Sequence, residues 1–156
     1  MKPRYSLPLL FTIILLSLTS RSLHAQTETQ QVMAVLNDFF TAINTSDSAA
    51  FNKVFFKDAH MFNSRSVNDS TVYASRPAVK TSIFKPGVQY RETMRTKGVK
   101  VEVHQHIAMA WVPYDFYTNN TFSHCGIDVF TLMKTDRGWK IALIAYSVEK
   151  KGCDGW

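Results

Sequence analysis

The C-terminal half of the chain is strand-like almost throughout, and this constrains the fold more than any other feature. Strand patterns cover Val99 to Val103, Ile107 to Tyr117, Thr121 to Lys134 and Trp139 to Val148. Asn119-Asn120 suits a two-residue hairpin turn because asparagine tolerates positive φ, and Thr135 to Gly138 suits a longer one. Consecutive hairpins of this kind predict an antiparallel meander.

Helical periodicity precedes the strands. Thr27 to Gln30 form a capping box that starts a helix. The apolar residues behind it repeat at the spacing of one helical face: Val32, Val35, Leu36, Phe39, Phe40 and Ile43. Asn44 to Asp47 can cap a second, short helix that carries Phe51, Val54 and Phe55. We expect these two helices to pack as a hairpin.

Between the helices and the meander, the pattern predicts a strand, a turn and a third helix. Lys57 to Asn63 alternate as a short strand does, and the polar run from Ser64 to Ser70 then turns the chain. Ser75 and Pro77 suit the start of a third short helix, which Lys85 to Gly87 would end. Helices first and strands last predict an α+β domain, in which a strongly curved antiparallel sheet packs on three N-terminal helices. Such a sheet encloses a pocket.

The first 25 residues have the layout of an export signal. Lys2 and Arg4 precede an apolar run from Leu7 to Leu18, and Ala25 offers a cleavage site. A membrane anchor is the alternative, but the apolar run is shorter than the roughly 20 residues that span a bilayer. We therefore interpret residues 1–25 as a signal peptide and residues 26–156 as a single domain that is exported, periplasmic or secreted.

Loss of the signal changes the charge of the chain. Lys2, Arg4 and Arg21 leave with it, so the formal charge falls from +6 to +3 (6 minus 3). The remaining basic residues are scattered between acidic ones and do not form a stripe. We therefore expect no nucleic-acid partner, and no membrane association after cleavage.

Cys125 and Cys153 are the only cysteines of the sequence. In an oxidising compartment such a pair favours a disulfide, although one buried and one exposed thiol is the alternative.

The order helix, short helix, strand, short helix and long meander resembles that of the nuclear transport factor 2-like superfamily. Gly126 to Phe130 and Gly138 to Ile141 share in this likeness, which covers essentially the whole mature chain. Ala110 to Tyr114 and Ser123 to Gly126 look closest to the exported, SnoaL-like bacterial branch. The resemblance implies a cone, in which a curved sheet over three helices encloses an apolar cavity, and a homodimer formed through the sheet.

The superfamily includes steroid isomerases and polyketide cyclases as well as members without known catalysis, so fold alone does not decide function. Asp128 matches an isomerase acid that stabilises an enolate oxygen. Phe39 matches the isomerase tyrosine and Asn63 approximately matches the catalytic carboxylate. Phenylalanine has no hydroxyl to donate and asparagine cannot take a proton from carbon, so the catalytic set is incomplete and the prediction leans away from an enzyme.

Asp128 is nevertheless the best candidate for a site residue. It sits between Ile127 and Val129, where an ionised carboxylate is costly unless it is paired. It is either a polar contact for a ligand or a structural acid bonded to a neighbour. His124 shares its strand face but lies about 13 Å away along the strand, so we expect no direct contact. The other residues expected in the pocket are Tyr114, His60, Asn63, Trp111, Phe130 and Tyr146.

His104 and His106 have the spacing that places two imidazoles on one strand face, as some zinc sites require. The resemblance instead places both at a turn, and no third ligand is close in sequence. We therefore predict no metal site and no cofactor.

The leading hypothesis is an exported domain that binds a small, largely apolar molecule in its cone. One alternative is a SnoaL-like acid–base enzyme that uses Asp128. Another is a non-catalytic interaction domain whose cone is filled by its own side chains.

Overall fold

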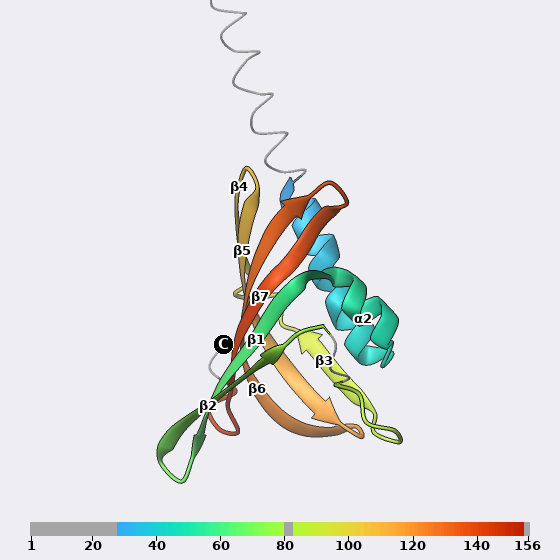
Figure 1. The fold of residues 1–156 in the computed structure, drawn as a ribbon. Coiled ribbons are helices and arrows are strands. Elements are labelled where there is room, and N and C mark those ends of the chain that lie inside the picture. The colour runs from blue at the N-terminus through green and yellow to red at the C-terminus, as the bar shows by residue number, and fades with distance from the viewer. Residues whose placement is uncertain (1–27, 80–82, 155–156) are drawn as a thin grey trace, which may run out of the picture.

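The computed structural model describes residues 28–79 and 83–154. In this part of the chain, a long helix (residues 28–44) and α2 (Ser48–Val54) lie on one face of a seven-stranded sheet (Figure 1). The strands are β1 (Phe55–Val67), β2 (Ser70–Pro77), β3 (Tyr90–Met94), β4 (Lys100–His104), β5 (Ile107–Thr118), β6 (Thr121–Thr135) and β7 (Gly138–Val148). The predicted signal peptide lies outside the described residues. No helix among those described is long and apolar enough to cross a membrane.

The sheet is strongly curved, as predicted, but it is mixed and not wholly antiparallel. Its order is β2-β1-β7-β6-β5-β3, with β4 also paired to β5. Every neighbouring pair is antiparallel except β1 and β7, which run parallel. A parallel pair needs a long connection, and here the whole intervening chain supplies it. The residue pattern of a single strand does not reveal its partner, so the sequence did not predict the parallel pairing of β1 with β7.

The meander follows the expected turns. Asn119 and Asn120 have φ values of 51° and 61° and connect β5 to β6. Lys134 lies opposite Trp139, as the turn before β7 predicts. The register of β6 and β7 then shifts between Thr131 and Leu132. A bulge of this kind bends and twists the strands, which contributes to the curvature of the sheet.

The region after α2 differs from the prediction in two respects. Residues 64–67 of the predicted turn continue β1, and the turn is confined to Asn68 and Asp69, both at positive φ. The end of the β1–β2 ribbon extends away from the body of the molecule (Figure 1). Its residues are largely exposed, so polar side chains carry no desolvation penalty there.

The third helix is the other difference, since the described residues contain only two helices. Ser75 and Pro77 belong to β2, where Pro77 lies opposite His60 at the end of an edge strand. At such a place the missing N–H of proline interrupts no hydrogen-bond ladder, so the residue that suggested a helix start fits a strand end equally well. Residues 80–82 of the predicted helix lie outside the described residues.

α2 begins at the predicted breaker segment. Asp47 caps the helix, because one of its carboxylate oxygens accepts hydrogen bonds of 2.9 Å from the backbone N–H groups of Ala49 and Ala50. Phe51 of α2 packs on Phe39 of the long helix, with ring centroids 5.6 Å apart. The two helices therefore meet through the apolar faces that their periodicity predicts.

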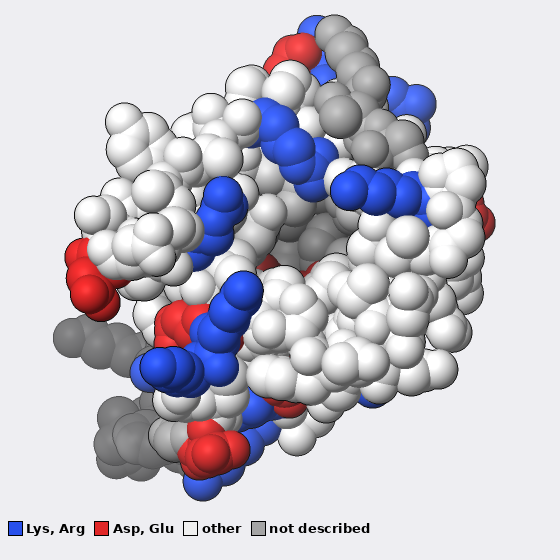
Figure 2. Space-filling view, turned by 90° about the horizontal axis from the view of Figure 1, so that it is seen from below, with Lys and Arg blue, Asp and Glu red and all other residues white. Residues whose placement is uncertain are grey.

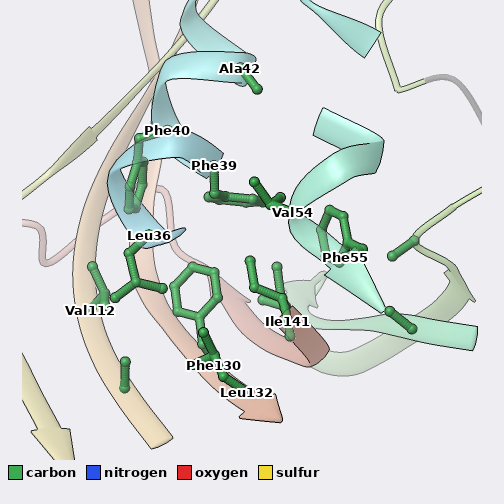
Figure 3. Packing of buried hydrophobic residues seen from close by; sticks show 14 of the residues in the cluster. Leu36, Phe39, Phe40, Ala42, Val54, Phe55, Val112, Phe130, Leu132 and Ile141 are labelled. Atoms are coloured by element: carbon green, nitrogen blue, oxygen red, sulfur yellow. The ribbon is translucent and has the colours of Figure 1, made fainter. Parts of the chain in front are cut away.

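The core lies between the helices and the inner face of the sheet. Phe39 points from the long helix toward Phe130 of β6, and the rings meet edge to face at 5.2 Å (Figure 3). Around them pack other buried residues, among them Leu36, Phe40, Val54, Val112, Leu132 and Ile141. We call this part of the cone the closed end, because side chains fill it.

Cys125 and Cys153 form a disulfide, which confirms the predicted bridge and is compatible with an oxidising compartment. The backbones of Cys125 and Glu149 exchange two hydrogen bonds of 2.9 Å. The register shift between β6 and β7, where Ala142 is the extra residue of β7, brings Cys125 opposite Glu149. The chain then returns through Gly152, at a φ of 76°, to place Cys153 beside Cys125.

Candidate functional site

The cone is hollow at the end away from the core. A cavity of about 250 Å³ lies between the two helices and the inner face of the sheet. We call this part the open end. Its aromatic walls come from both helices and from the strands, and include Phe39, Phe51, Phe84, Tyr90 and Phe116. The hollow opens on the face shown in Figure 2, where Lys and Arg side chains surround it and acidic atoms are visible inside.

Asp128 lies on the wall of this cavity, at the centre of β6. Strand alternation turns Asp128 and Phe130 inward, and Asp128 is only 3% exposed. Its Oδ2 is the one buried side-chain oxygen or nitrogen in the described chain that has no hydrogen-bond partner. Most buried polar groups are satisfied, so this unpartnered carboxylate oxygen is free to accept a hydrogen bond from inside the cavity.

Glu92 is the second buried carboxyl group of the cavity, at 6% exposure. It is the central residue of β3, and its backbone N–H donates a hydrogen bond of 2.7 Å to Oδ1 of Asn44 at the end of the long helix. This bond ties β3 to the helix and helps to place the Glu92 side chain beside Asp128.

The two carboxyl groups interact and titrate as a pair. Burial raises the pKa of Asp128 to about 7, although a hydrogen bond with Glu92 opposes the shift. Burial also raises the pKa of Glu92 well above its ordinary value, and the charge of Asp128 adds to the effect. Two adjacent carboxylates in an apolar wall cannot both ionise cheaply, so the pair retains a proton at neutral pH. It therefore presents one donor together with several acceptors.

Tyr114 is fixed on the cavity wall by a glycine. Tyr114 lies opposite Gly126, and its hydroxyl donates a hydrogen bond of 2.7 Å to the backbone oxygen of Ser147. A Cβ at position 126 would lie 2.1 Å from that oxygen and 2.9 Å from the Tyr114 ring. Only glycine, which has no Cβ, allows the Tyr114 side chain to pass so close to residue 126 on its way to Ser147. Because its proton is already donated, Tyr114 offers a ligand only an acceptor oxygen.

A polar chain runs from Asp128 toward the opening. Tyr146 lies directly opposite Asp128 on β7, and Asn63 lies opposite Tyr146 on β1. Nδ2 of Asn63 donates to the Tyr146 hydroxyl at 3.3 Å, and Nη1 of Arg65 donates to Oδ1 of Asn63 at 3.2 Å. Burial raises the pKa of Tyr146, so its hydroxyl stays protonated and can donate into the cavity.

His124 lies on the cavity wall near the β5–β6 turn. Its ring stacks on Phe116 at 4.9 Å, and its Nδ1 lies 3.0 Å from the Ser123 hydroxyl. Burial, followed by the charge of Lys150, lowers the pKa of His124, so the ring is neutral at pH 7. It contributes a flat, uncharged surface to the wall.

The structure brings together four of the predicted pocket residues and places three elsewhere. Asp128, Tyr114, Asn63 and Tyr146 line the cavity. Phe130 lies in the core beneath it. His60 and Trp111 point away from the cavity, because each alternates with an inward neighbour, Met61 and Val112 respectively. Trp111 is 41% exposed on the outer face of the sheet, and His60 lies there beside Phe62.

Glu92 and Arg76 were missed by the sequence reading. β3 follows Lys85 to Gly87, and the strand prediction began only at Val99. The available signal was the alternation of Tyr90, Glu92 and Met94 with polar Arg91 and Thr93, which places Glu92 on the apolar face. Arg76 was hidden by the expectation of a helix at that position.

The histidine pair behaves as the resemblance implied. His104 ends β4 and lies opposite Ile107, so His106 is a turn residue beside Gln105, which has a φ of 50°. Among the described residues, no three His, Cys, Asp or Glu side chains are grouped so that they could hold a metal ion.

The family model described as "Putative lumazine-binding" matches residues 27–147. The chain belongs to this family. Its fold is that of nuclear transport factor 2-like proteins, as the resemblance in sequence implied. No curated protein sequence matches the chain significantly.

Solved structures share the architecture. A nuclear transport factor 2-like superfamily protein from Salmonella enterica has 14% identity and a TM-score of 0.62, over 81% of this chain and 94% of that chain. A relative with a cystatin-like fold from Novosphingobium aromaticivorans has 12% identity and a TM-score of 0.63, over 86% and 89%. One from Shewanella baltica has 16% identity and a TM-score of 0.56, over 80% and 96%. At these identities the likeness concerns the fold alone.

Proposed function

We propose that the open end of the cone binds a small, largely apolar molecule whose polar group contacts Asp128. The observation that carries the proposal is the buried and unpartnered Oδ2 of Asp128 on the wall of a cavity with aromatic sides. A mostly apolar cavity with a few convergent polar groups is the usual form of a small-molecule site. The aromatic walls favour a flat, unsaturated ligand.

The name of the family agrees with this chemistry, because lumazine is a flat nitrogen heterocycle whose edge carries both N–H donors and oxygen acceptors. A carboxyl pair that holds one proton presents a donor and an acceptor side by side, as such an edge requires. Lumazine is therefore the first probe to use with this chain.

The test combines extraction and titration. Native mass spectrometry of protein exported by living cells should release a bound small molecule, and calorimetry should detect binding of added lumazine. Asp128→Asn should weaken that binding about 10-fold or more, since a hydrogen bond to a charged group contributes about 1.5–3 kcal/mol. Asp58→Asn, at an exposed surface ion pair, is the matched control. Equal affinities of the two variants, or no extracted molecule and no lumazine binding, would sink the proposal.

A second candidate function is acid–base catalysis by the same carboxyl pair. Paired carboxyl groups with raised pKa values in a cavity are typical of such chemistry. In this role Asp128 acts as the base and Glu92 holds the proton. Asp128→Asn would then abolish turnover of a bound ketone while the binding of a substrate analogue persists. Loss of binding alone supports the first candidate.

We also propose that the chain forms a homodimer through the outer face of the sheet. An apolar stripe crosses this face, made up of Phe62, Ile107, Met109, Trp111, Val129 and Met133. Contiguous exposed apolar surface of this kind is typical of association sites. Light scattering should give a dimer mass, and Trp111→Lys should give a monomer; a wild-type monomer at all concentrations contradicts the dimer.

We propose that the protein is exported and that its signal is removed before Gln26. The disulfide supports an oxidising compartment. N-terminal sequencing of the exported product checks the cleavage site, and retention of Met1 at the N-terminus contradicts it.

A further inference from the structure

We propose that the ligand of the cone is an organic acid, whose carboxylate binds Arg76 near the opening while its other end reaches Asp128. This inference rests on the proposed function and adds the ligand's charge and polarity. Two features of the structure lead to it: a guanidinium without an acidic partner on the cavity wall, and its position relative to the carboxyl pair.

Arg76 lines the cavity from β2 and is partly buried. Its Nη2 donates to the sulfur of Met61 at 3.1 Å and its Nη1 to the backbone oxygen of Pro77 at 3.4 Å. In the described part of the chain, no Asp or Glu side chain forms an ion pair with Arg76. Both contacts are to weak or uncharged acceptors, so the charge of this group is poorly compensated.

Arg95 is an arginine of the same protein whose charge is paired with a carboxylate. It binds both oxygens of Asp115, at 2.6 and 2.8 Å, and it also donates to the backbone oxygen of Cys153. The pKa of Arg95 is raised, first by its hydrogen bond with Asp115, whereas burial lowers the pKa of Arg76. Of these two guanidinium groups, that of Arg76 therefore gains more from an anion supplied by a ligand.

Arg76 and Asp128 lie on opposite sides of the cavity. Arg76 lies opposite Met61, an inward residue of β1, so it shares the cavity face of the sheet. Three strand-to-strand steps separate β2 from β6, or about 14 Å at the backbone. Side chains extend inward from both strands and reduce that span. Tyr146 lines the cavity from β7, a strand that lies between β2 and β6 in the sheet, and it lies directly opposite Asp128.

A ligand that contacts both ends must therefore have a body of about one or two fused rings. One end carries an anion for Arg76, and the other a carbonyl, hydroxyl or ring nitrogen for the carboxyl pair. A planar carboxylate matches the fork of a guanidinium in a bidentate arrangement. The basic residues around the hollow in Figure 2 would also attract such an acid to the opening.

The experiment uses three bicyclic probes with the mature exported protein: 6-hydroxy-2-naphthoate, 2-naphthol without the carboxylate, and 2-naphthyl phosphate. Arg76→Met removes the charge and keeps an apolar stem. We expect it to weaken the naphthoate about 10- to 100-fold, the effect of a lost charged hydrogen bond, and to change the affinity for 2-naphthol less than about twofold. Arg91→Met makes the same charge change outside the cavity, against the Tyr117 ring, and should affect neither probe.

The outcomes separate the two proposals. If no probe binds and no small molecule is extracted from the wild type, the binding function itself fails. If 2-naphthol binds as well as the naphthoate, or if Arg76→Met affects both equally, the organic-acid assignment fails and the binding function stands. Tighter binding of the phosphate than of the naphthoate overturns the carboxylate in favour of a phosphate ester. If the Arg76→Met variant does not fold, Arg76→Lys is the second variant, since it keeps the charge but lacks the planar guanidinium. It should still weaken the binding of the naphthoate selectively.

Discussion

Two buried acids, one at each end of the cone, have opposite surroundings. Glu28, at 7% exposure, accepts a hydrogen bond of 2.8 Å from Nε1 of Trp139 and an ion-paired one of 2.5 Å from Nζ of Lys134. Asp128, at 3% exposure, faces a second carboxyl group and leaves one oxygen without a partner in the described chain. Both acids are equally hidden from water, yet only the first has a cation and a donor beside it.

The difference shows that burial alone does not define a site. At the closed end the carboxylate of Glu28 is compensated by Lys134 and Trp139, so it contributes to the cohesion of the fold. At the open end the same kind of group stays uncompensated beside empty space. Such an arrangement costs stability, and proteins commonly accept that cost where a ligand supplies the missing partner.

The largest expected effect comes from removing a ring of the closed end. Phe130→Ala should lower the free energy of unfolding by about 3–5 kcal/mol, because it leaves a void where Phe39 and Phe40 pack. Phe116→Ala on the cavity wall should cost less than half as much, since one side of that ring already faces the cavity. Urea denaturation measures both values. Equal losses would show that the two ends are equally packed.

The disulfide stabilises the open end, and its removal is expected to have the next largest effect. The two cysteines are 28 residues apart in sequence, and closing such a loop contributes about 3–4 kcal/mol in the chain-entropy model. Replacing both Cys125 and Cys153 by serine should lower stability by about that amount. Hydrogen exchange should rise first around Cys125 and Glu149, while the closed end stays protected. Uniform exchange along β6 would contradict this division.

The two acids should respond in opposite directions to loss of their charge. Glu28→Gln leaves Lys134 without its ion pair and should cost about 1–3 kcal/mol. Asp128→Asn should instead raise the stability at pH 8, because an amide needs no ionisation in the apolar wall and can donate to Glu92. Thermal melts of the two variants beside the wild type check the signs. If Asp128→Asn destabilises the protein at pH 8 as much as Glu28→Gln does, the comparison fails.

The smallest expected effect, counted per pH unit, is the dependence of the free energy of unfolding on pH. The pKa of Asp128 is about 7 in the folded chain, against an ordinary value of 3.8 in the unfolded chain. Between these values the folded state binds more protons, so the free energy of unfolding falls as pH rises, by up to about 1.4 kcal/mol per pH unit and group. The raised pKa of Glu92 acts in the same direction and extends the decrease in the free energy of unfolding to higher pH.

Denaturation at pH 5, 6, 7 and 8 measures this slope. Asp128→Asn should flatten it, and subtracting the two curves removes contributions from histidines that both proteins share. A wild-type curve that rises relative to the variant over this range would show that the carboxyl pair is ionised and stabilised in the fold.

Local patterns predicted the elements whose partners are close in sequence. Both helices of the described chain and the meander from β4 to β7 lie where periodicity and turn residues place them. β3 was missed because its five residues are mostly polar and partly exposed, so they look like a loop. The β1–β2 ribbon was shortened for the same reason. In both segments, strand pairing overrides local preference.

The sequence by itself predicted the two described helices and the meander from β4 to β7, named Asp128 as a pocket residue, and favoured a bridge between its only two cysteines. These features depend on periodicity and composition, which are local. Only the tertiary structure decided that Glu92 lies beside Asp128, that Arg76 shares their cavity, and that Trp111 and His60 face away from it. These contacts bring together β2, β3 and β6 across a curved sheet, and no spacing along the chain encodes them.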